Sequence, residues 1–301
     1  MKRIYIAGCG GMLGEAFYKK FNKKYDIKCT DKDVNEDWLS FLDFRDFEAY
    51  RKDVKDFNPD YLFHLGAHTD LEYCEKNPND AYMTNTLSVE HAVDIANELK
   101  IPVLYISSAG IFDGKKEIYD DWDIPNPLGV YARSKYLGER IVLEKAQQGL
   151  VCRAGWMIGG GPKKDKKYIQ KIMKQIKDGN KEIFVVKDKG GIPTYTHDFA
   201  ANVELLINKG RTGLYNIVCQ GEITDNRLEV TRELIRILKL EGQVKIIPVN
   251  SDYFKEEYFA KRPSAERLFN LKLKLRGLDI MRDWKVALKE YLNNYYPRYL
   301  E

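Results

Sequence analysis

Ile4-Tyr5-Ile6-Ala7-Gly8-Cys9-Gly10-Gly11-Met12-Leu13-Gly14 is the stretch of this chain that decides the fold. The apolar run predicts a buried strand, and the glycines predict a tight turn into a helix. Glycines at 8, 11 and 14 let the backbone turn, let a pyrophosphate approach the main chain, and let the helix pack on its strand. Because a helix N-terminus carries unpaired N–H groups, it favours an anion. We therefore expect a nucleotide at this turn.

A second predicted strand, over residues 27–30, ends at Asp31. The spacing of roughly 20 residues from the turn is near that of the carboxylate that binds ribose in dinucleotide-binding folds. Such a carboxylate accepts hydrogen bonds from both ribose hydroxyls and repels a 2′-phosphate, so we expect NADH to be favoured over NADPH. Lys28 and Lys32 lie close enough to soften this preference. The alternative is that Asp31 only caps a turn.

Length, charge and cysteine content narrow the class of protein. With 301 residues, 44% hydrophobic and 31% charged, the chain matches a soluble globular protein of about two domains. The sequence contains no membrane-length apolar run and no signal peptide, so we expect a cytoplasmic protein. A net charge of +4 does not favour nucleic acid as a partner. An odd number of cysteines without a Cys-x-x-Cys pair predicts reduced packing residues: Cys9, Cys29, Cys74, Cys152 and Cys219.

Strands and helices alternate through the first half of the chain. A helix is expected over 45–57, strands over 61–65 and 103–106, and one long helix over 78–100. Alternation implies right-handed crossovers and a parallel sheet, whose strand ends collect at one ligand-binding edge. We therefore predict an α/β fold: a Rossmann-type doubly wound parallel sheet with a smaller mixed α/β substrate-binding lobe toward the C-terminus.

The strand-helix rhythm loosens after residue 155, and this divides the chain. We assign 1–155, joined by roughly 191–220, to the dinucleotide-binding domain. The substrate-binding lobe then comprises 156–190 and 221–301, with a terminal helix over 281–296.

Tyr131 and Lys135 are four residues apart at the start of a predicted helix, so both side chains project from one face. Ser108 follows the strand over 103–106. These three groups suit a hydride transfer at a carbonyl carbon coupled to a proton transfer at its oxygen. Tyr131 is the expected proton donor, Ser108 orients the carbonyl, and Lys135 with the oxidised nicotinamide lowers the pKa of Tyr131 from about 10 toward 7. A Tyr-x-x-x-Lys pair by itself is more often a packed tyrosine and a solvated lysine. Here the pair follows a glycine turn, an acidic residue at the end of the second strand and a serine at the end of a later strand, and this order favours a catalytic role.

Further stretches occur in the same order as in a known family. They are 8–14, 42–44, 66–69 with Glu72 and Glu75, 127–135 with Gly138 and Glu139, 153–156, 193–195, and Arg262-Pro263 with Arg267-Leu268. With them, the chain resembles the extended short-chain dehydrogenases/reductases and, within that group, the dTDP-4-dehydrorhamnose reductase family, over nearly its whole length. The resemblance implies NAD(P)H-dependent reduction of the C4 keto group of a 4-keto-6-deoxy sugar nucleotide, in the synthesis of deoxysugar precursors.

The resemblance also assigns site residues. It implies that Ser108, Tyr131 and Lys135 are catalytic. Substrate contacts would come from Ser108, Ala109, Trp156 and Arg262. The cofactor, NADH or NADPH with NADH favoured, would contact Gly8, Gly11, Met12, Leu13, Gly14, Asp31, Asp43, Phe44, Gly66, Ala67, His68, Ser107, Tyr131 and Lys135.

The chain also departs from the family pattern. Where the family has Thr-Asp-Tyr, this sequence has Ser108-Ala109-Gly110, so the serine replaces the threonine hydroxyl but two sugar contacts are absent. The Asp-Glu pair that a 4,6-dehydratase needs is missing. The metal-contacting glutamate of the family does not align, because Glu15 is one position away and Ala16 takes its place, so we expect no metal.

Several alternatives stay open at this point. One is an NAD-retaining sugar-nucleotide 4-epimerase with the same three catalytic groups; another is a non-catalytic dinucleotide-binding regulatory subunit like that of methionine adenosyltransferase. The basic loop with Lys163, Lys164, Lys166 and Lys167 either meets the diphosphate of the substrate or is solvated. As partners we expect a sugar-nucleotide substrate, allow for a homodimer, and expect neither nucleic acid nor membrane.

Overall fold

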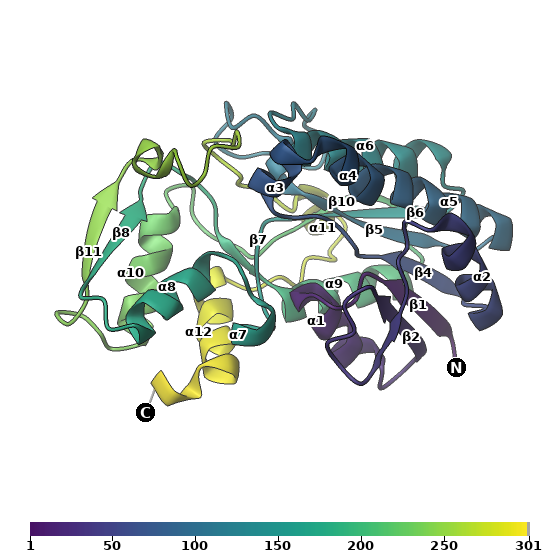
Figure 1. Ribbon diagram of the computed structural model, residues 1–301, viewed down its shortest axis with the longest axis horizontal. Coiled ribbons are helices and arrows are strands. Elements are labelled where there is room, and N and C mark those ends of the chain that lie inside the picture. Colours follow the sequence, from purple (N-terminus) through teal and green to yellow (C-terminus); the bar gives the residue numbers. More distant parts are fainter. Residues whose placement is uncertain (300–301) are drawn as a thin grey trace.

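The computed structural model describes residues 1–299, which form a larger part built on one sheet and a smaller part beside it (Figure 1). The strands of the large sheet are β1 (Arg3–Ala7), β2 (Asp26–Asp31), β3 (Leu39–Phe41), β4 (Tyr61–His64), β5 (Val103–Ser108), β6 (Gly149–Ala154) and β10 (Gly213–Ile217). All pair in parallel, in the order β10-β6-β5-β4-β1-β2-β3. The chain reverses its direction of travel across the sheet between β1 and β4, which is where open α/β sheets bind ligands.

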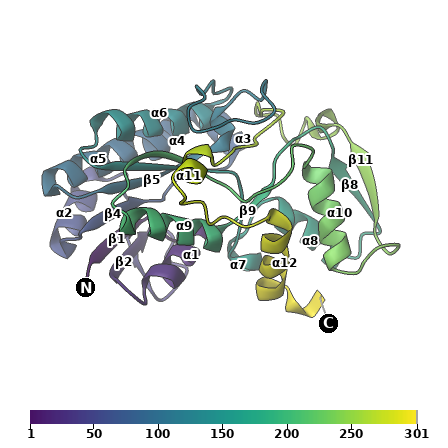
Figure 2. The same ribbon diagram turned by 180° about the vertical axis from the view of Figure 1, so that it is seen from behind.

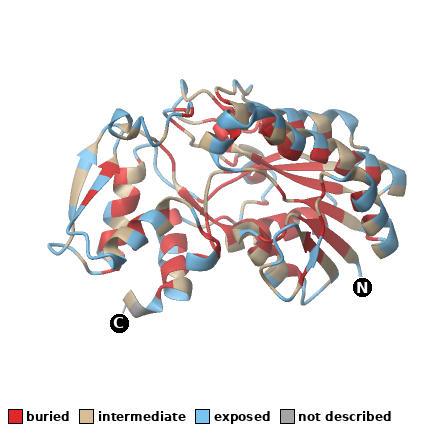
Figure 3. Cartoon of the chain, in the orientation of Figure 1, coloured by how far each residue is buried: buried red, intermediate tan, exposed pale blue. Residues whose placement is uncertain are grey.

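Helices cover both faces of this sheet (Figures 1 and 2). The first face is covered by α2 (Phe47–Phe57), α5 (Ser88–Leu99) and α6 (Val130–Lys145), and the opposite face by α1 (Met12–Phe21) and α9 (Thr196–Asn208). Alternation along β1 separates the two layers, since Ile4 and Ile6 belong to the cluster under α1 and α9, whereas Tyr5 and Ala7 belong to the cluster under α2 and α5. Buried residues accordingly concentrate in the strands and on the inward faces of the helices (Figure 3).

The smaller part is a mixed α/β lobe toward the C-terminus. Its strands β8 (Glu182–Val186) and β11 (Lys245–Val249) pair in parallel. Its helices are α7 (Gly161–Lys164), α8 (Tyr168–Lys177), α10 (Arg227–Ile237) and α12 (Trp284–Tyr295). A second short pair, β7 (Trp156–Ile158) with β9 (Pro193–Tyr195), follows the end of β6 and leads back into α9.

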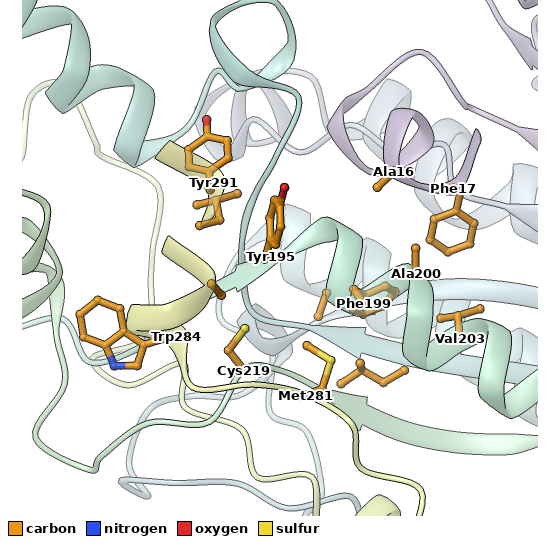
Figure 4. Close-up of a cluster of buried hydrophobic side chains, with 14 of the residues drawn as sticks. Ala16, Phe17, Tyr195, Phe199, Ala200, Val203, Cys219, Met281, Trp284 and Tyr291 are labelled. Atoms are coloured by element: carbon orange, nitrogen blue, oxygen red, sulfur yellow. The ribbon is translucent and has the colours of Figure 1, made fainter. Parts of the chain in front are cut away.

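One hydrophobic cluster continues from the sheet into the lobe (Figure 4). It joins Phe17 of α1 and Phe199 of α9 to Tyr195 of β9 and to Trp284 and Tyr291 of α12, all with essentially no exposed surface. Because apolar burial contributes roughly 25 cal/mol per Å², this continuous core holds the lobe against the sheet. The lobe is therefore fixed over the carboxyl ends of the strands.

The predicted α/β class, with a Rossmann-type parallel sheet, is confirmed. The five cysteines are free and buried, as expected for packing residues. The domain boundaries stay a prediction, although β10 lies in the large sheet and β8 outside it. None of the helices within residues 1–299 is both long and apolar enough to cross a membrane.

Some element bounds differ from expectation. The predicted helix over 78–100 is interrupted: α4 (Pro78–Tyr82) is followed by a π-helical turn, Met83–Leu87, before α5. The predicted helix over 45–57 begins at Phe47, because Asp46 caps it by accepting from Ala49 N. The terminal helix begins at Trp284 rather than 281, because Asp283 caps it. The elements that the sequence did not predict include the short strands β3, β7 and β9 and the short helices α3 (Leu71–Lys76), α7 and α11 (Leu271–Leu275).

Candidate active site

The glycine turn links β1 to α1 at the carboxyl edge of the sheet. Gly8 has φ of 74°, and a Cβ there would come within 2.2 Å of Gly66 Cα, so the ends of β1 and β4 approach as only glycines allow. A Cβ at Gly14 would come within 2.0 Å of Cys9 O, which explains the close packing of α1 on its strand. Around Gly11, the N-cap of α1, a Cβ would meet no atom within 4 Å. The turn therefore presents the helix N-terminus, beginning with Met12 and Leu13, to open space.

Asp31 stands at the end of β2 and is tied to the same turn. Its Oδ2 accepts from Gly10 N at 2.8 Å, and its Oδ1 accepts from Asp33 N at 2.9 Å. Each carboxylate oxygen has a second lone pair, so both remain able to accept from another donor. The structure thus places Asp31 beside the glycine turn, as the ribose hypothesis requires. Asp31 also stabilises that turn through its hydrogen bond with Gly10. Its role toward ribose stays a prediction.

The remaining predicted cofactor residues lie along the same edge. The ring of Phe44 packs over Gly66, where a Cβ would come within 2.2 Å of it. His68 Nε2 lies 2.7 Å from a carboxylate oxygen of Asp80, and Ala67 lies between Gly66 and His68 in the loop after β4. Asp43, expected as a cofactor contact, lies three residues before Asp46, which caps α2. Asp43 forms an ion pair with Arg45, which lowers the pKa of the Asp43 carboxyl.

Ser108 and Tyr131 meet across Gly110. Ser108 ends β5, and its Oγ accepts from Gly110 N at 3.1 Å. A Cβ on Gly110 would lie 3.4 Å from Ser108 Oγ and 3.7 Å from Tyr131 Cε1, in ordinary van der Waals contact with both. Ala109 is buried beside them at 1% exposure, so its side chain is not open to a substrate. Ser107, the preceding residue, keeps a buried Oγ that has no hydrogen-bond partner within residues 1–299.

Burial governs the protonation of Tyr131 and Lys135. It raises the pKa of the Tyr131 phenol to about 12, against the lowering effect of a hydrogen bond with Ser108. It lowers the pKa of Lys135 to about 7, against the field of Glu139. In the chain by itself, loss of water disfavours both charged forms. The expectation that Lys135 together with the oxidised nicotinamide lowers the pKa of Tyr131 concerns the cofactor-bound protein and stays a prediction. Lys135 Nζ lies 4.2 Å from the centre of the Tyr105 ring, which stabilises its charged form in part.

The lowered pKa of Lys135 predicts a pH-dependent stability. Between its folded pKa of about 7 and the ordinary value of 10.5, the unfolded chain binds a proton that the folded chain does not. Stability therefore rises with pH in this window. Relative to the Lys135→Met variant, the free energy of unfolding of the wild type should rise by about 2 kcal/mol between about pH 7 and 9. Urea unfolding at several pH values measures this; a constant difference would contradict it.

The π-helical turn carries a site residue that sequence reasoning missed. Asn85 is fully buried, accepts from His68 N at 2.8 Å, and donates to His68 O and to Ser134 Oγ, each at 3.0 Å. Ser134 lies on α6 between Tyr131 and Lys135. Asn85 therefore fixes the loop after β4 to the helix that carries both groups. An asparagine inside a predicted helix is the only signal that the sequence offered.

Two lysines of the basic loop reach the cofactor edge. Lys164 is buried, and its Nζ donates to Gly10 O at 2.9 Å and to Asn35 Oδ1 at 3.0 Å. Lys167 Nζ donates to Thr69 O at 2.8 Å. The interpretation of this run as a solvated loop is therefore wrong for these two lysines. A contact with the substrate's diphosphate stays a prediction.

The predicted substrate residues lie on the lobe side. Trp156 of β7 donates from Nε1 to Glu266 Oε2 at 3.1 Å, and the guanidinium of Arg227 lies 5.0 Å from the centre of its ring. Arg262 forms a two-pronged ion pair with Glu72 at 2.7 and 2.8 Å. The structure thus places Trp156 between Glu266 and Arg227. Arg262, by contrast, is already paired with Glu72. Glu266 and Arg227 were not predicted as site residues, because each lies far in sequence from its neighbours here.

Comparison with known proteins agrees with this geometry. A family model described as RmlD substrate binding domain matches residues 1–296. A dTDP-4-dehydrorhamnose reductase of Aggregatibacter actinomycetemcomitans is 27% identical over 96% of this chain and 98% of that protein. The crystal structure of dTDP-4-dehydrorhamnose reductase from Bacillus anthracis in complex with NADP has a TM-score of 0.87 at 26% identity, covering 98% of this chain and all of that one. Methionine adenosyltransferase 2 subunit beta of Danio rerio is 25% identical over 93% of this chain and 86% of that protein.

Proposed function

This chain belongs to the RmlD substrate binding domain family, and from that premise we propose that it is an NAD(P)H-dependent reductase of the C4 keto group of a 4-keto-6-deoxy sugar nucleotide. The observation that carries the proposal is the convergence of Ser108 and Tyr131 around Gly110, with Lys135 one helical turn further along α6. These groups stand at the carboxyl edge of the sheet, as does the glycine turn. A carbonyl held there faces both a hydroxyl and a phenol.

The residues present fit a dinucleotide. The N-cap of α1 at Gly11 is open, the end of β1 at Gly8 is shaped by a positive φ, and Ser107 keeps a buried hydroxyl without a partner within the described chain. An open helix N-terminus suits the pyrophosphate, and Asp31 suits the adenosine ribose. NADH or NADPH, when bound, supplies the hydride for C4.

Side chains of the protein itself donate the proton and orient the substrate carbonyl. Ser108 donates a hydrogen bond to the carbonyl oxygen and holds it near Tyr131. Tyr131 gives its phenolic proton to that oxygen as C4 becomes the secondary alcohol. Lys135, in its charged form, stabilises the phenolate that remains and helps to position the nicotinamide ribose. Trp156 and the lobe enclose the sugar nucleotide above this edge.

A substrate panel tests this function. Purified protein is mixed with NADH and a set of keto-sugar nucleotides, and the near-ultraviolet absorbance of NADH is followed. Loss of NADH in equal amount to the alcohol formed supports the reductase. Sugar interconversion without added cofactor would indicate the epimerase instead, and dinucleotide binding with no turnover of any substrate would indicate a regulatory subunit. A homodimer stays a prediction that light scattering can test.

The cofactor preference gives a prediction at Asp31. Asp31→Ala should weaken NADH binding by roughly tenfold and weaken NADPH binding less, because a ribose acceptor is lost while repulsion of the 2′-phosphate is relieved. Asp33→Ala is the matched control, since it removes an exposed carboxylate two residues away. Fluorescence titration with each cofactor measures both effects. Equal losses for the two cofactors would remove Asp31 from the ribose and leave it only as the brace of Gly10.

A further inference from the structure

The segment 260–268 crosses from the lobe to the edge of the sheet and is held by hydrogen bonds at its centre. Ser264 Oγ donates to Gly114 O at 2.8 Å, in the loop after β5. Gly190 N donates to Ser264 O at 2.8 Å, and Glu266 N donates to Gly190 O at 2.9 Å. The backbone at Glu266 is therefore fixed by hydrogen bonds to the lobe while its neighbours contact the loop beside Ser108. A side chain at this position is placed rigidly.

The carboxylate of Glu266 is oriented but not fully used. Its Oε2 accepts from Trp156 Nε1 at 3.1 Å, and its Oε1 has no hydrogen-bond partner within residues 1–299. Glu266 is partly buried and keeps some accessible surface. Burial raises the pKa of this carboxyl, and its charge in turn raises the pKa of Tyr131. Glu266 thus lies beside Trp156 and close enough to the proposed proton donor for its charge to act on that phenol.

An open oxygen on an enclosed carboxylate has a free-energy cost, because water no longer solvates it fully. Arg227, Arg262 and Lys189 lie near enough to lower the pKa of Glu266, but none forms an ion pair with it in the described chain. These cations disfavour a positively charged ligand at the open oxygen. A neutral hydroxyl donor satisfies the oxygen without adding charge.

We propose that Glu266 is a substrate-binding residue that accepts a hydrogen bond from a ring hydroxyl of the hexose beside the reacting carbonyl. The proposal rests on the reductase function and refines it, since it says which hexoses the site prefers. Trp156 then acts as the positioning residue that holds Oε2 and turns Oε1 toward the sugar. A hexose lacking the hydroxyl loses this contact and leaves the carboxylate unsatisfied.

The test combines Glu266→Gln with substrate analogues that lack the ring hydroxyl at C2 or at C3. Glutamine keeps the size of the side chain and an acceptor for Trp156. With the parent substrate, kcat/KM should fall roughly 10- to 100-fold in the variant, because a hydrogen bond to a charged group is lost. With one of the deoxy analogues, wild type and variant should differ by less than about threefold, since the contact is already absent. The control is Glu229→Gln, which removes one partner of a surface ion pair with Arg232 on α10. It should change kcat/KM neither for the parent substrate nor for the deoxy analogues.

Each outcome is decisive. Equal loss on the parent substrate and on both analogues would overturn the proposal, and a shifted pH profile with that result would show that Glu266 acts only through Tyr131. An unchanged kcat/KM for the parent substrate would overturn it as well. Retained NADH binding and an unchanged melting temperature confirm that the variant is folded. If wild type reduces no keto-sugar nucleotide, the proposed function itself fails, and the inference about Glu266 falls with it.

Discussion

Tyr131→Phe should lower kcat by roughly 10²- to 10⁴-fold while leaving the affinity for NADH nearly unchanged, because it removes one oxygen that is needed only when the proton moves. The ring of phenylalanine fills the same space beside Gly110, so the fold and the cofactor cleft are preserved. Single-turnover kinetics with a saturating keto-sugar nucleotide, together with fluorescence titration of NADH, separates the two effects. Tyr136→Phe on the same helix is the matched control and should keep most of the activity.

The protonation state of Tyr131 strengthens this prediction. With a pKa raised to about 12 by burial, the phenol keeps its proton throughout the neutral range and is available as a donor. A reduction needs that form at the start of each turnover, whereas a phenolate base would suit the reverse reaction. Turnover by Tyr131→Phe at the wild-type rate would assign the proton to another group, and Ser108 would be the nearest candidate.

The sequence predicted the parts of the site that depend on local spacing. The glycine turn, Asp31 at the end of β2, and Tyr131 with Lys135 on one helix face follow from short-range geometry and were found where expected. The parallel sheet followed from alternation, because crossover handedness and strand adjacency are general rules. None of these inferences required knowledge of which distant residues touch.

The contacts between distant segments could not be predicted in the same way. Glu266 meets Trp156 across 110 residues, and Lys164 meets Gly10 across 154. Nothing in either local pattern distinguishes such a side chain from an exposed one. The upward effect of burial on the pKa of Tyr131 could not be predicted for the same reason, since that burial is a property of the assembled lobe and sheet. Local pattern therefore predicted the proposed catalytic groups, whereas tertiary packing determines their burial and their pKa values.

Packing also produces the largest expected effect on stability, at the buried pair of Glu139 and Arg153. Arg153 Nη2 and Nε donate to the two oxygens of Glu139 at 2.6 and 3.0 Å, and the side chains are 1–2% exposed. Glu139 lies one turn after Lys135 on α6, and Arg153 stands on β6 opposite Ser107 of β5. The pair thus joins the helix that carries the proposed catalytic residues to the strand beside Ser108.

Glu139→Ala should therefore lower the free energy of unfolding by about 3–5 kcal/mol, because it leaves a guanidinium buried without its counter-ion. Arg153 Nη1 already has no hydrogen-bond partner within residues 1–299. Because that nitrogen finds no acceptor even in the wild type, we expect no nearby group to replace the lost carboxylate. Glu144→Ala, which breaks an exposed pair with Arg140 on the same helix, should cost less than about 1 kcal/mol. Urea unfolding of the three proteins, with midpoint and slope compared, measures the contrast.

Replacing both members of the buried pair, with Glu139→Leu and Arg153→Met, should recover most of the stability lost by Glu139→Ala, since apolar groups of similar size carry no desolvation cost. Activity should not recover in parallel. Glu139 raises the pKa of Lys135, so its removal leaves a larger share of Lys135 uncharged at neutral pH and weakens the stabilisation of the Tyr131 phenolate. A double variant that regains stability and full activity together would show that the pair serves only the fold. Stability regained without activity would show that the buried carboxylate also sets the charge of Lys135.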